Sequence, residues 1–209
     1  MAFFRSYAIG ALIASAAFLF AYQHGGQPGV FDHYLLTLSW SPEFCYSNPQ
    51  KAECAAGQRR AFIVHGLWPE FRGGGGPEYC SPAPGPAQPA GMLDMMPDLH
   101  LIEHEWLAHG TCSGLSADNY FGQIRKAFES VRIPRQFAAP RAQFAISPVD
   151  LKKAFEGANP SLNDSGIMIQ CRGPYLSAVE ICLSKDLRPI PCPAVHECRA
   201  RMVRVAPVR

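Results

Sequence analysis

Eight cysteines spread along the chain constrain its fold more than any other feature. None belongs to a CxxC pair or to a cysteine–histidine pattern of the zinc-finger type. An even number of scattered cysteines is typical of disulfide-bonded proteins in oxidising compartments, so the sequence predicts four disulfides. Eight cysteines allow roughly a hundred pairings, and their spacing alone leaves the connectivity open.

The N-terminal residues indicate the same kind of compartment. Arg5 precedes an apolar run from about Tyr7 to Tyr22, which has the length of a signal-peptide core and is short for a membrane span. We expect a signal peptide over residues 1–22, with an uncleaved membrane anchor as the alternative, and a Gly-rich linker over 23–30. Because no later segment is long enough to cross a bilayer, we expect a secreted or periplasmic protein, without stable membrane association once the signal is removed.

The remaining sequence predicts a single α+β domain. A chain of 209 residues, 48% of them apolar, can bury a proper core. Extended patterns predict strands over 33–40, 61–64, 167–170 and 175–183, and helical spacing predicts helices over 97–109, about 117–131 and 148–158. We assign the domain to residues 31–200 and a basic C-terminal tail to 201–209. The net charge of +2 is too small for a tight nucleic-acid binder, so an RNA partner would be a transient substrate.

Two histidines and a carboxylate lie within six positions of one predicted helix. Pro97 suits its first turn and Gly110 the position just past its end. In a helix over 97–109, Glu105 and His109 would share a face, about 40° apart, and His104 would lie about a quarter turn away. A carboxylate one turn from an imidazole can hold its tautomer, stabilise its charged form or bind an ionic substrate. A solvated helix end is the plainer interpretation.

A further histidine from elsewhere in the chain favours the functional interpretation. His65 follows the predicted strand at 61–64, and Gly66 allows a sharp turn there, so we expect His65 at a strand end beside a cleft. Residues 72–91 are mostly Gly, Pro and Ala, and predict a flexible surface flap pinned by Cys80.

Two mechanisms fit a cleft with these groups and no nucleophilic Ser or Cys motif. A zinc site is disfavoured, because His104 and His109 would lie about 140° apart around the helix, so we expect no metal and no cofactor. The alternative is general acid–base catalysis by two imidazoles. One takes the proton of a ribose 2′-hydroxyl that attacks the adjacent phosphodiester, and the other protonates the departing 5′ oxygen.

Two ordered segments resemble the signatures of the ribonuclease T2 family. They are His65-Gly66-Leu67-Trp68-Pro69, and His104-Glu105-Trp106 followed by His109-Gly110-Thr111-Cys112. The resemblance runs from Phe31 to about Cys198 and implies a secreted, metal-independent, largely base-nonspecific endoribonuclease. It implies a central antiparallel sheet backed by helices, and RNA cleavage to 2′,3′-cyclic phosphates and then 3′-phosphates.

The resemblance also implies roles for individual residues. His109 would be the general base, His65 the general acid, Glu105 would assist the transition state and His104 would bind the phosphate. Trp68 offers a stacking face for single-stranded RNA, although packing explains it equally well, and Glu70 lies where the family often places an acidic base-recognition residue. The implied disulfides are Cys80–Cys112, Cys171–Cys198, Cys182–Cys192 and Cys45–Cys54.

One position departs from the family pattern. Ala108 stands where the family usually has a Lys immediately before the second histidine. Loss of such a charge could slow the reaction on the order of 10²–10³-fold, unless Arg59, Arg60 or Arg72 replaces it. We expect a slow but real enzyme that acts on RNA and not on DNA, as a monomer. The alternative is a catalytically weak secreted protein that binds RNA or another partner on the same scaffold.

Overall fold

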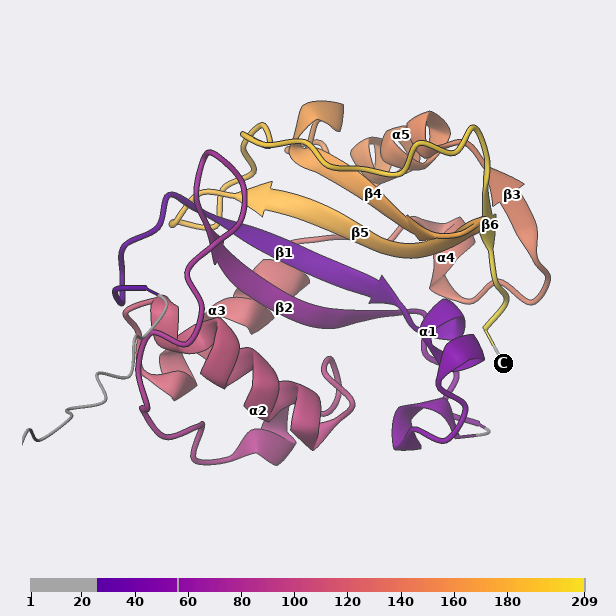
Figure 1. The fold of residues 1–209 in the computed structure, drawn as a ribbon. Helices are drawn as coiled ribbons and strands as arrows, with labels where there is room; N and C mark the ends of the chain where they lie inside the picture. The colour runs from indigo at the N-terminus through magenta and orange to yellow at the C-terminus, as the bar shows by residue number, and fades with distance from the viewer. Residues whose placement is uncertain (1–25, 56, 209) are drawn as a thin grey trace, which may run out of the picture.

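The computed structural model describes residues 26–55 and 57–208, which form one six-stranded sheet with helices packed against it (Figure 1). The expected signal peptide and the start of the linker lie outside the described residues. The strands are β1 His33–Trp40, β2 Phe62–Glu70, β3 Phe144–Ile146, β4 Ile167–Arg172, β5 Tyr175–Leu183 and β6 Val203–Val205. The α-helices are α1 Ser41–Ser47, α2 Leu99–Ala108, α3 Ala117–Glu129, α4 Arg135–Ala138 and α5 Pro148–Ala158. Short 3-10 helices lie between these elements, at Ala52–Cys54, Pro89–Met92, Gly110–Cys112 and Asp164–Gly166.

The sheet confirms the predicted α+β class. Its order is β2-β1-β5-β6-β3, and β4 also pairs with β5. Every pairing is antiparallel except that of β5 with β6. β1 lies between β2 and β5 and is buried along almost its whole length, which explains its nearly continuous apolar sequence. β2, which carries His65, is the first strand in this order, at one edge of the sheet, and it contacts α2.

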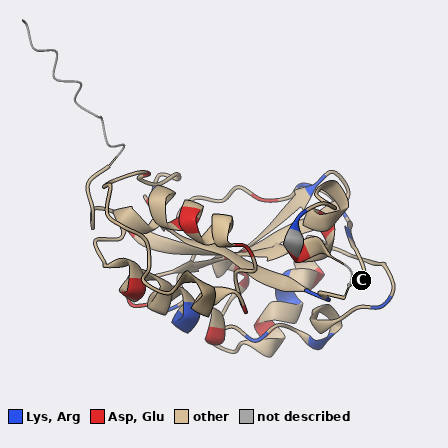
Figure 2. Ribbon diagram, turned by 90° about the horizontal axis from the view of Figure 1, so that it is seen from below, with Lys and Arg blue, Asp and Glu red and all other residues tan. Residues whose placement is uncertain are grey.

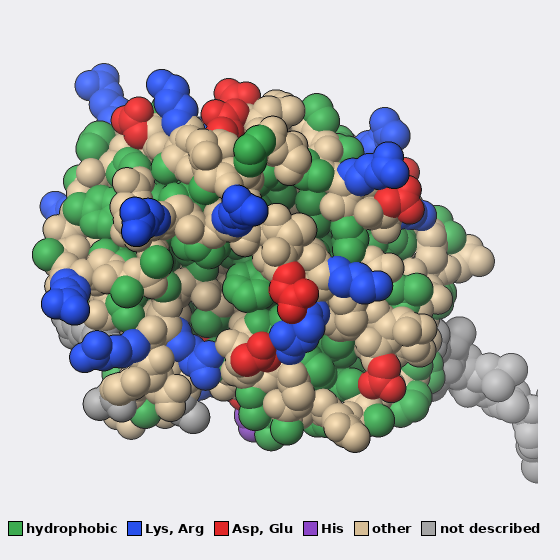
Figure 3. Space-filling model, turned by 180° about the vertical axis from the view of Figure 1, so that it is seen from behind, with side chains coloured by type: hydrophobic (Ala, Val, Ile, Leu, Met, Phe, Trp, Pro, Cys, Tyr) green, Lys and Arg blue, Asp and Glu red, His purple; other side chains and the backbone are tan. Residues whose placement is uncertain are grey.

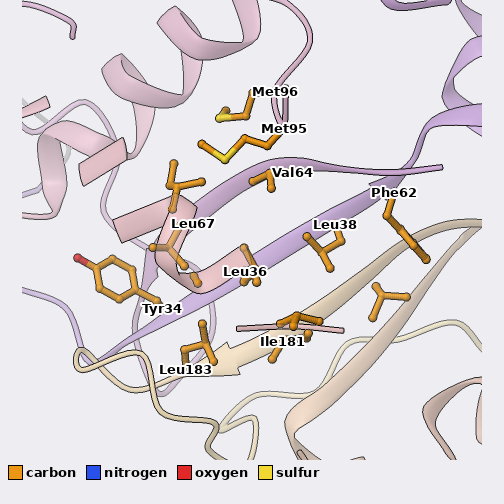
Figure 4. Packing of buried hydrophobic residues seen from close by; sticks show 14 of the residues in the cluster. Tyr34, Leu36, Leu38, Phe62, Val64, Leu67, Met95, Met96, Ile181 and Leu183 are labelled. Carbon is orange, nitrogen blue, oxygen red and sulfur yellow. The ribbon is translucent and has the colours of Figure 1, made fainter. Parts of the chain in front are cut away.

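One face of the sheet carries the main hydrophobic core. Tyr34, Leu36 and Leu38 alternate along β1 and point into it, with side chains from β2 and β5 and with Met95 and Met96 beside them (Figure 4). Residues of α2, α3, α4 and α5 all belong to this core. In Figure 1, α2 and α3 lie at the β1–β2 end of the sheet and α5 lies at β4. Met95 and Met96 are therefore core residues.

The three predicted helices begin at side-chain caps. Asp98, Ser116 and Ser147 accept hydrogen bonds from backbone N–H groups in the first turns of α2, α3 and α5. Pro97 therefore precedes the cap of α2 rather than occupying its first turn. α2 ends at Ala108, one residue earlier than the sequence predicts, and His109 is its C-terminal cap.

The segment expected as a basic tail contributes to the domain. Val203 and Val205 are fully buried in the main core, and Val203–Val205 pairs with β3 and β5. An alternating apolar pattern this short is hard to distinguish from a tail, because only two side chains carry it. The domain therefore extends beyond residue 200.

Four disulfides join the pairs that the family resemblance implies: Cys45–Cys54, Cys80–Cys112, Cys171–Cys198 and Cys182–Cys192. The predicted flap over 72–91 is tied down at several points in addition to Cys80. The Tyr79 N–H donates to the Ala108 carbonyl, and the Trp106 indole donates to the Ala83 carbonyl at 2.8 Å. The segment is thus fastened against α2, rather than held only at its middle.

Charged side chains are dispersed over the described residues. Figure 2 places Lys, Arg, Asp and Glu mainly on helices, turns and loops, and Figure 3 shows basic side chains among apolar and acidic ones on the face seen from behind. This distribution agrees with the small net charge. No helix within the described residues is long and apolar enough to span a membrane.

Candidate active site

His65 occupies a β-bulge in the middle of β2. Thr37 pairs with Gly66 and Leu38 with Val64, so His65 is the extra residue between two paired positions. The expectation of a strand end at His65 is wrong, because β2 continues to Glu70. The bulge turns the imidazole toward Ser39, whose Oγ lies 3.2 Å from Nδ1 of His65. Sequence reasoning missed Ser39, since only the register of β1 against β2 brings it beside His65.

Glu105 reaches His65 past Gly66. Its Oε1 lies 3.4 Å from Nε2 of His65, and its Oε2 accepts a 2.7 Å hydrogen bond from the Trp68 indole. A Cβ at Gly66 would collide with this Trp68–Glu105 pair and would lie 2.9 Å from Trp68 Cδ1. The glycine is therefore needed for close approach, and its φ is not positive.

His109 arrives from the end of α2. Its ring centroid lies 5.2 Å from that of Trp68, and the ring of His65 lies 5.4 Å from Trp68 on its own strand. Trp68 thus contacts both imidazoles, from two segments far apart in the sequence. The helix end is fixed by Gly110, where a Cβ would meet the Trp106 ring and lie 2.8 Å from Tyr120 Cδ1. Gly110 therefore serves close packing and not a left-handed turn.

His104 is exposed and lies beside His109, with 6.3 Å between their ring centroids. Atoms of His104, Glu105 and His109 that could ligate a metal lie within 4.8 Å of one another. The sequence argument against chelation assumed that the helix continues through residue 109, and that premise is wrong. Proton transfer is still favoured over metal binding here, because one oxygen of Glu105 accepts a hydrogen bond from Trp68 and the other faces His65.

Burial sets the protonation of these groups. It raises the pKa of Glu105 to about 8, against the opposing effect of the Trp68 hydrogen bond. Burial, followed by the nearby His104 and His65, lowers the pKa of His109 to about 4. Burial and then His104 lower the pKa of His65 as well. Near neutral pH, Glu105 and His109 are therefore uncharged, and the contact between Glu105 and His65 is not an ion pair.

Glu70 lies two residues beyond Trp68 and so on the same face of β2. Burial, followed by the carboxylates of Glu180 and Glu78, raises its pKa to about 7. Trp106, in contrast, is buried in the main core. The structure therefore places Glu70 on the face of β2 that carries Trp68, and Trp106 in the main core.

The arginines suggested as replacements for the missing lysine lie elsewhere. Arg59 and Arg60 line a pocket at α1, and Arg72 lies near His33, whose pKa its charge lowers. Within the described residues, no Lys or Arg is among the groups that shift the pKa of His65, Glu105 or His109. Ala108 itself is only 2% exposed. Among the described residues, the groups at the site that can carry positive charge are therefore the histidines.

The arrangement offers two imidazoles that differ in environment, both held against one indole and one neutral carboxyl. A pair of this kind can remove one proton and deliver another on the two sides of a reacting phosphate. The exposed imidazole of His104 beside the pair can donate a hydrogen bond to a phosphate oxygen, and the buried carboxyl of Glu105 can support His65.

Comparison with known proteins agrees with this geometry. The model of the Ribonuclease T2 family matches residues 31–192, which include both histidine segments. A ribonuclease from Aeromonas hydrophila is 30% identical over 171 residues, which cover 79% of this chain and 78% of that protein. The fold matches an RNase-related protein from Calystegia sepium with a TM-score of 0.70 at 21% identity, over 86% of this chain and 98% of that one. RNase NT in complex with 5′-AMP matches with a TM-score of 0.64 at 22% identity, over 84% and 97%. The chain therefore belongs to the ribonuclease T2 family.

Proposed function

We propose that this ribonuclease cleaves single-stranded RNA by metal-independent transphosphorylation, with His109 as the base and His65 as the acid. The supporting observation is that these two imidazoles, from β2 and from the end of α2, meet at Trp68 and Glu105. His109 takes the proton of the 2′-hydroxyl, whose oxygen bonds to phosphorus. The bond to the 5′ oxygen breaks, and that oxygen takes a proton from His65. The products are a 2′,3′-cyclic phosphate and a 5′-hydroxyl, and slow hydrolysis then gives a 3′-phosphate.

The pKa shifts of the two histidines support this division of roles. His109, with its pKa near 4, is neutral and ready to accept a proton over most of the acidic range. Burial, followed by the charge of His104, lowers the pKa of His65. The negative charge of a bound phosphate group would raise this pKa. The acid and the base are thus in their working forms together in mildly acidic solution.

Glu105 and His104 would stabilise the charge that develops on phosphorus. Glu105 keeps its proton up to about pH 8 and is fully buried, so it would act on the phosphate through His65, whose Nε2 lies 3.4 Å from its Oε1. His104 is exposed at the same place and can bind the phosphate when protonated. In the absence of a lysine at position 108, these two residues carry the task, and we expect slow turnover.

The same chemistry defines the partners. A 2′-hydroxyl is the nucleophile, so DNA is not a substrate. Trp68 and Glu70 would contact a base of the substrate strand, with stacking that tolerates different sequences.

Four disulfides support secretion or a periplasmic location. His65, His104, Glu105 and His109 come together within one chain, which supports a monomer.

The test is cleavage of RNA in EDTA, followed by identification of the new termini. We expect 2′,3′-cyclic phosphates with the wild-type protein, and their loss in His65→Ala and in His109→Ala. Val149→Ala, an exposed change on α5, serves as the control for handling and purity. Cleavage that EDTA abolishes would indicate a zinc hydrolase, and no cleavage in any buffer would indicate a binding protein on this scaffold.

A further inference from the structure

The imidazole of His65 makes one hydrogen bond with the described residues, and that bond is to Ser39. Oγ of Ser39 lies 3.2 Å from Nδ1 of His65. The other ring nitrogen, Nε2, lies 3.4 Å from Oε1 of Glu105, and that oxygen is buried with no hydrogen-bond partner among the same residues. The ring of the proposed acid is therefore held by a hydrogen bond on its Nδ1 side alone.

Ser39 reaches His65 because of the register of β1 against the bulged strand β2. Along β1, Leu38 and Trp40 are fully buried in the main core, so the side chain of Ser39 between them points to the opposite face of the sheet. Ser39 pairs with Ile63 on β2. The bulge at His65 places the imidazole beside the half-buried hydroxyl of Ser39.

The aromatic contact of His65 does not distinguish the two possible orientations of its ring. The ring lies edge-on to Trp68, with 5.4 Å between centroids, and a contact of this kind depends on the shape of the ring rather than on which atoms are nitrogen. A half-turn about the bond from Cβ to the ring would exchange Nδ1 with Cδ2 and Nε2 with Cε1. It would place carbon against the Ser39 hydroxyl, and the hydrogen bond would be lost. Ser39 therefore selects the orientation in which Nε2 faces Glu105.

The same contact determines which nitrogen keeps a proton. When His65 is charged, both ring nitrogens carry hydrogen, and Nδ1–H donates to Oγ of Ser39. Nε2–H is then the proton that passes to the 5′ oxygen, and the neutral ring retains the proton on Nδ1. A hydrogen bond from a charged ring is stronger than one from a neutral ring, so Ser39 favours the charged form. It opposes burial and the charge of His104, which lower the pKa of His65.

The titratable groups near His65 come from the end of α2. Glu105 keeps its proton up to about pH 8, and His104 is exposed. His109, at the C-terminal cap of the same helix, has a pKa that His65 lowers. No Lys or Arg of the described residues is among the groups that shift the pKa of His65. The Ser39 hydroxyl does not itself titrate in this range, so its removal changes the pKa of His65 without removing a second titration.

We propose that Ser39 is a positioning residue for the reaction: its hydroxyl fixes the orientation and the tautomer of His65, so that Nε2 delivers the proton to the 5′ oxygen. The proposal rests on the proposed function, in which His65 is the acid. The role needs no contact between Ser39 and RNA. Removal of the hydroxyl should therefore slow the protonation of the leaving group and leave substrate binding unchanged.

The test compares Ser39→Ala with the wild type on two substrates. The first is a dinucleotide, whose leaving 5′ oxygen needs a proton, and the second is a ribonucleoside 3′-(p-nitrophenyl phosphate), whose leaving group departs without one. Ser39→Ala should lower kcat for the dinucleotide about 5- to 50-fold with KM unchanged, and kcat for the p-nitrophenyl ester less than about twofold. The alkaline limb of kcat/KM for the dinucleotide should move to lower pH by about half a unit or more.

Two further variants separate the hydroxyl from other effects of the change. Ser39→Thr keeps the hydroxyl and should restore both the dinucleotide rate and the position of the alkaline limb. Ser130→Ala is the matched control, because it also removes a serine hydroxyl that makes one hydrogen bond, to the Ala127 carbonyl at 2.7 Å at the end of α3. It should leave both rates and the pH profile unchanged.

An equal fall of kcat on the two substrates in Ser39→Ala overturns the proposal, as does an alkaline limb that stays in place or moves to higher pH. Titration of the His65 ring by NMR measures the same contact without a substrate. It should show the proton of the neutral ring on Nδ1 in the wild type and a lower pKa in Ser39→Ala. If the wild type cleaves neither substrate, the proposed function fails. The titration then decides whether Ser39 fixes the ring, and an unchanged pKa and tautomer in Ser39→Ala would show that it does not.

Discussion

Glu105 is fully buried, no Lys or Arg of the described residues shifts its pKa, and the fold retains it at a cost in stability. An unfolded carboxyl ionises near pH 4.5, whereas the folded one keeps its proton to about pH 8. Between these values the folded state holds more protons than the unfolded state, so stability falls as the pH rises. This is the behaviour expected of a residue kept for chemistry rather than for packing.

Glu105→Gln should therefore stabilise the protein and lower its activity. Glutamine can still accept the hydrogen bond of Trp68, but it cannot ionise. Thermal unfolding at pH 8 should show a gain on the order of 2–4 kcal/mol, which disappears at pH 4. Equal stability of the two proteins at both pH values would contradict the raised pKa.

Gly66→Ala tests the close approach at β2. The added methyl group would displace the Trp68 indole from Glu105, which costs about 1–3 kcal/mol and separates the two proposed catalytic histidines from their shared support. We expect a lower Tm and a fall in kcat of at least about tenfold. Gly157→Ala, on an open stretch of α5 where a Cβ meets nothing within 4 Å, is the matched control. Equal activity of both variants would mean that Gly66 has no such role.

At the scale of elements, the position of the site depends on where β2 and α2 depart from regular structure. A bulge turns His65 out of the ladder, and the end of the helix at Ala108 brings His109 next to His104 and Glu105. The sequence predicts both elements, because their apolar periodicity is clear. It cannot predict the bulge or the exact helix end, because these depend on the register of β1 and on the packing of Gly110 against Trp106 and Tyr120.

Ala108→Lys tests whether the end of α2 lacks a useful charge. Ala108 is one turn from His104 and close to Glu105 on the helix, so a long side chain could extend from it into the site while its stem stays buried. We expect kcat to rise about tenfold or more and Tm to fall by a few degrees. Ala108→Met, with similar bulk and no charge, should lower Tm without raising kcat. An unchanged kcat in the lysine variant would show that the histidines and Glu105 already meet the need.

At the scale of the whole molecule, the disulfides and the sheet were predictable to different extents. The family resemblance implies all four pairs, although cysteine spacing alone does not, because pairing depends on which strands become neighbours. β6 escapes prediction, since Val203 and Val205 are too few to distinguish a strand from a tail. The polar lining of the α1 pocket also comes from residues far apart in sequence, such as Glu53 and Tyr175.

Removing Cys80–Cys112 should destabilise the protein more than removing Cys45–Cys54. The first pair closes a loop with a sequence separation of 32 and fastens residues 72–91 to the end of α2, whereas the second has a separation of 9. Chain entropy predicts losses of about 3–4 and about 2–3 kcal/mol respectively. Urea unfolding of the two double Cys→Ala variants measures this order. The reverse order would indicate that the 72–91 segment is not held by its disulfide.

The central claim is that His65 and His109 form one acid–base pair, and the pH dependence of kcat/KM tests it most directly. The rate should rise as His109 loses its proton near pH 4 and fall as His65, whose pKa burial lowers from its ordinary 6.5, loses its own. The profile is then a bell with its maximum between the two titrations. The measurement uses a single-site RNA oligomer in EDTA, with buffers overlapped to separate salt effects. A bell with its maximum on the acidic side of pH 6.5, with the alkaline limb lost together with most activity in His65→Ala, is the predicted result. A maximum above pH 8, or a profile without an alkaline limb, would contradict the account.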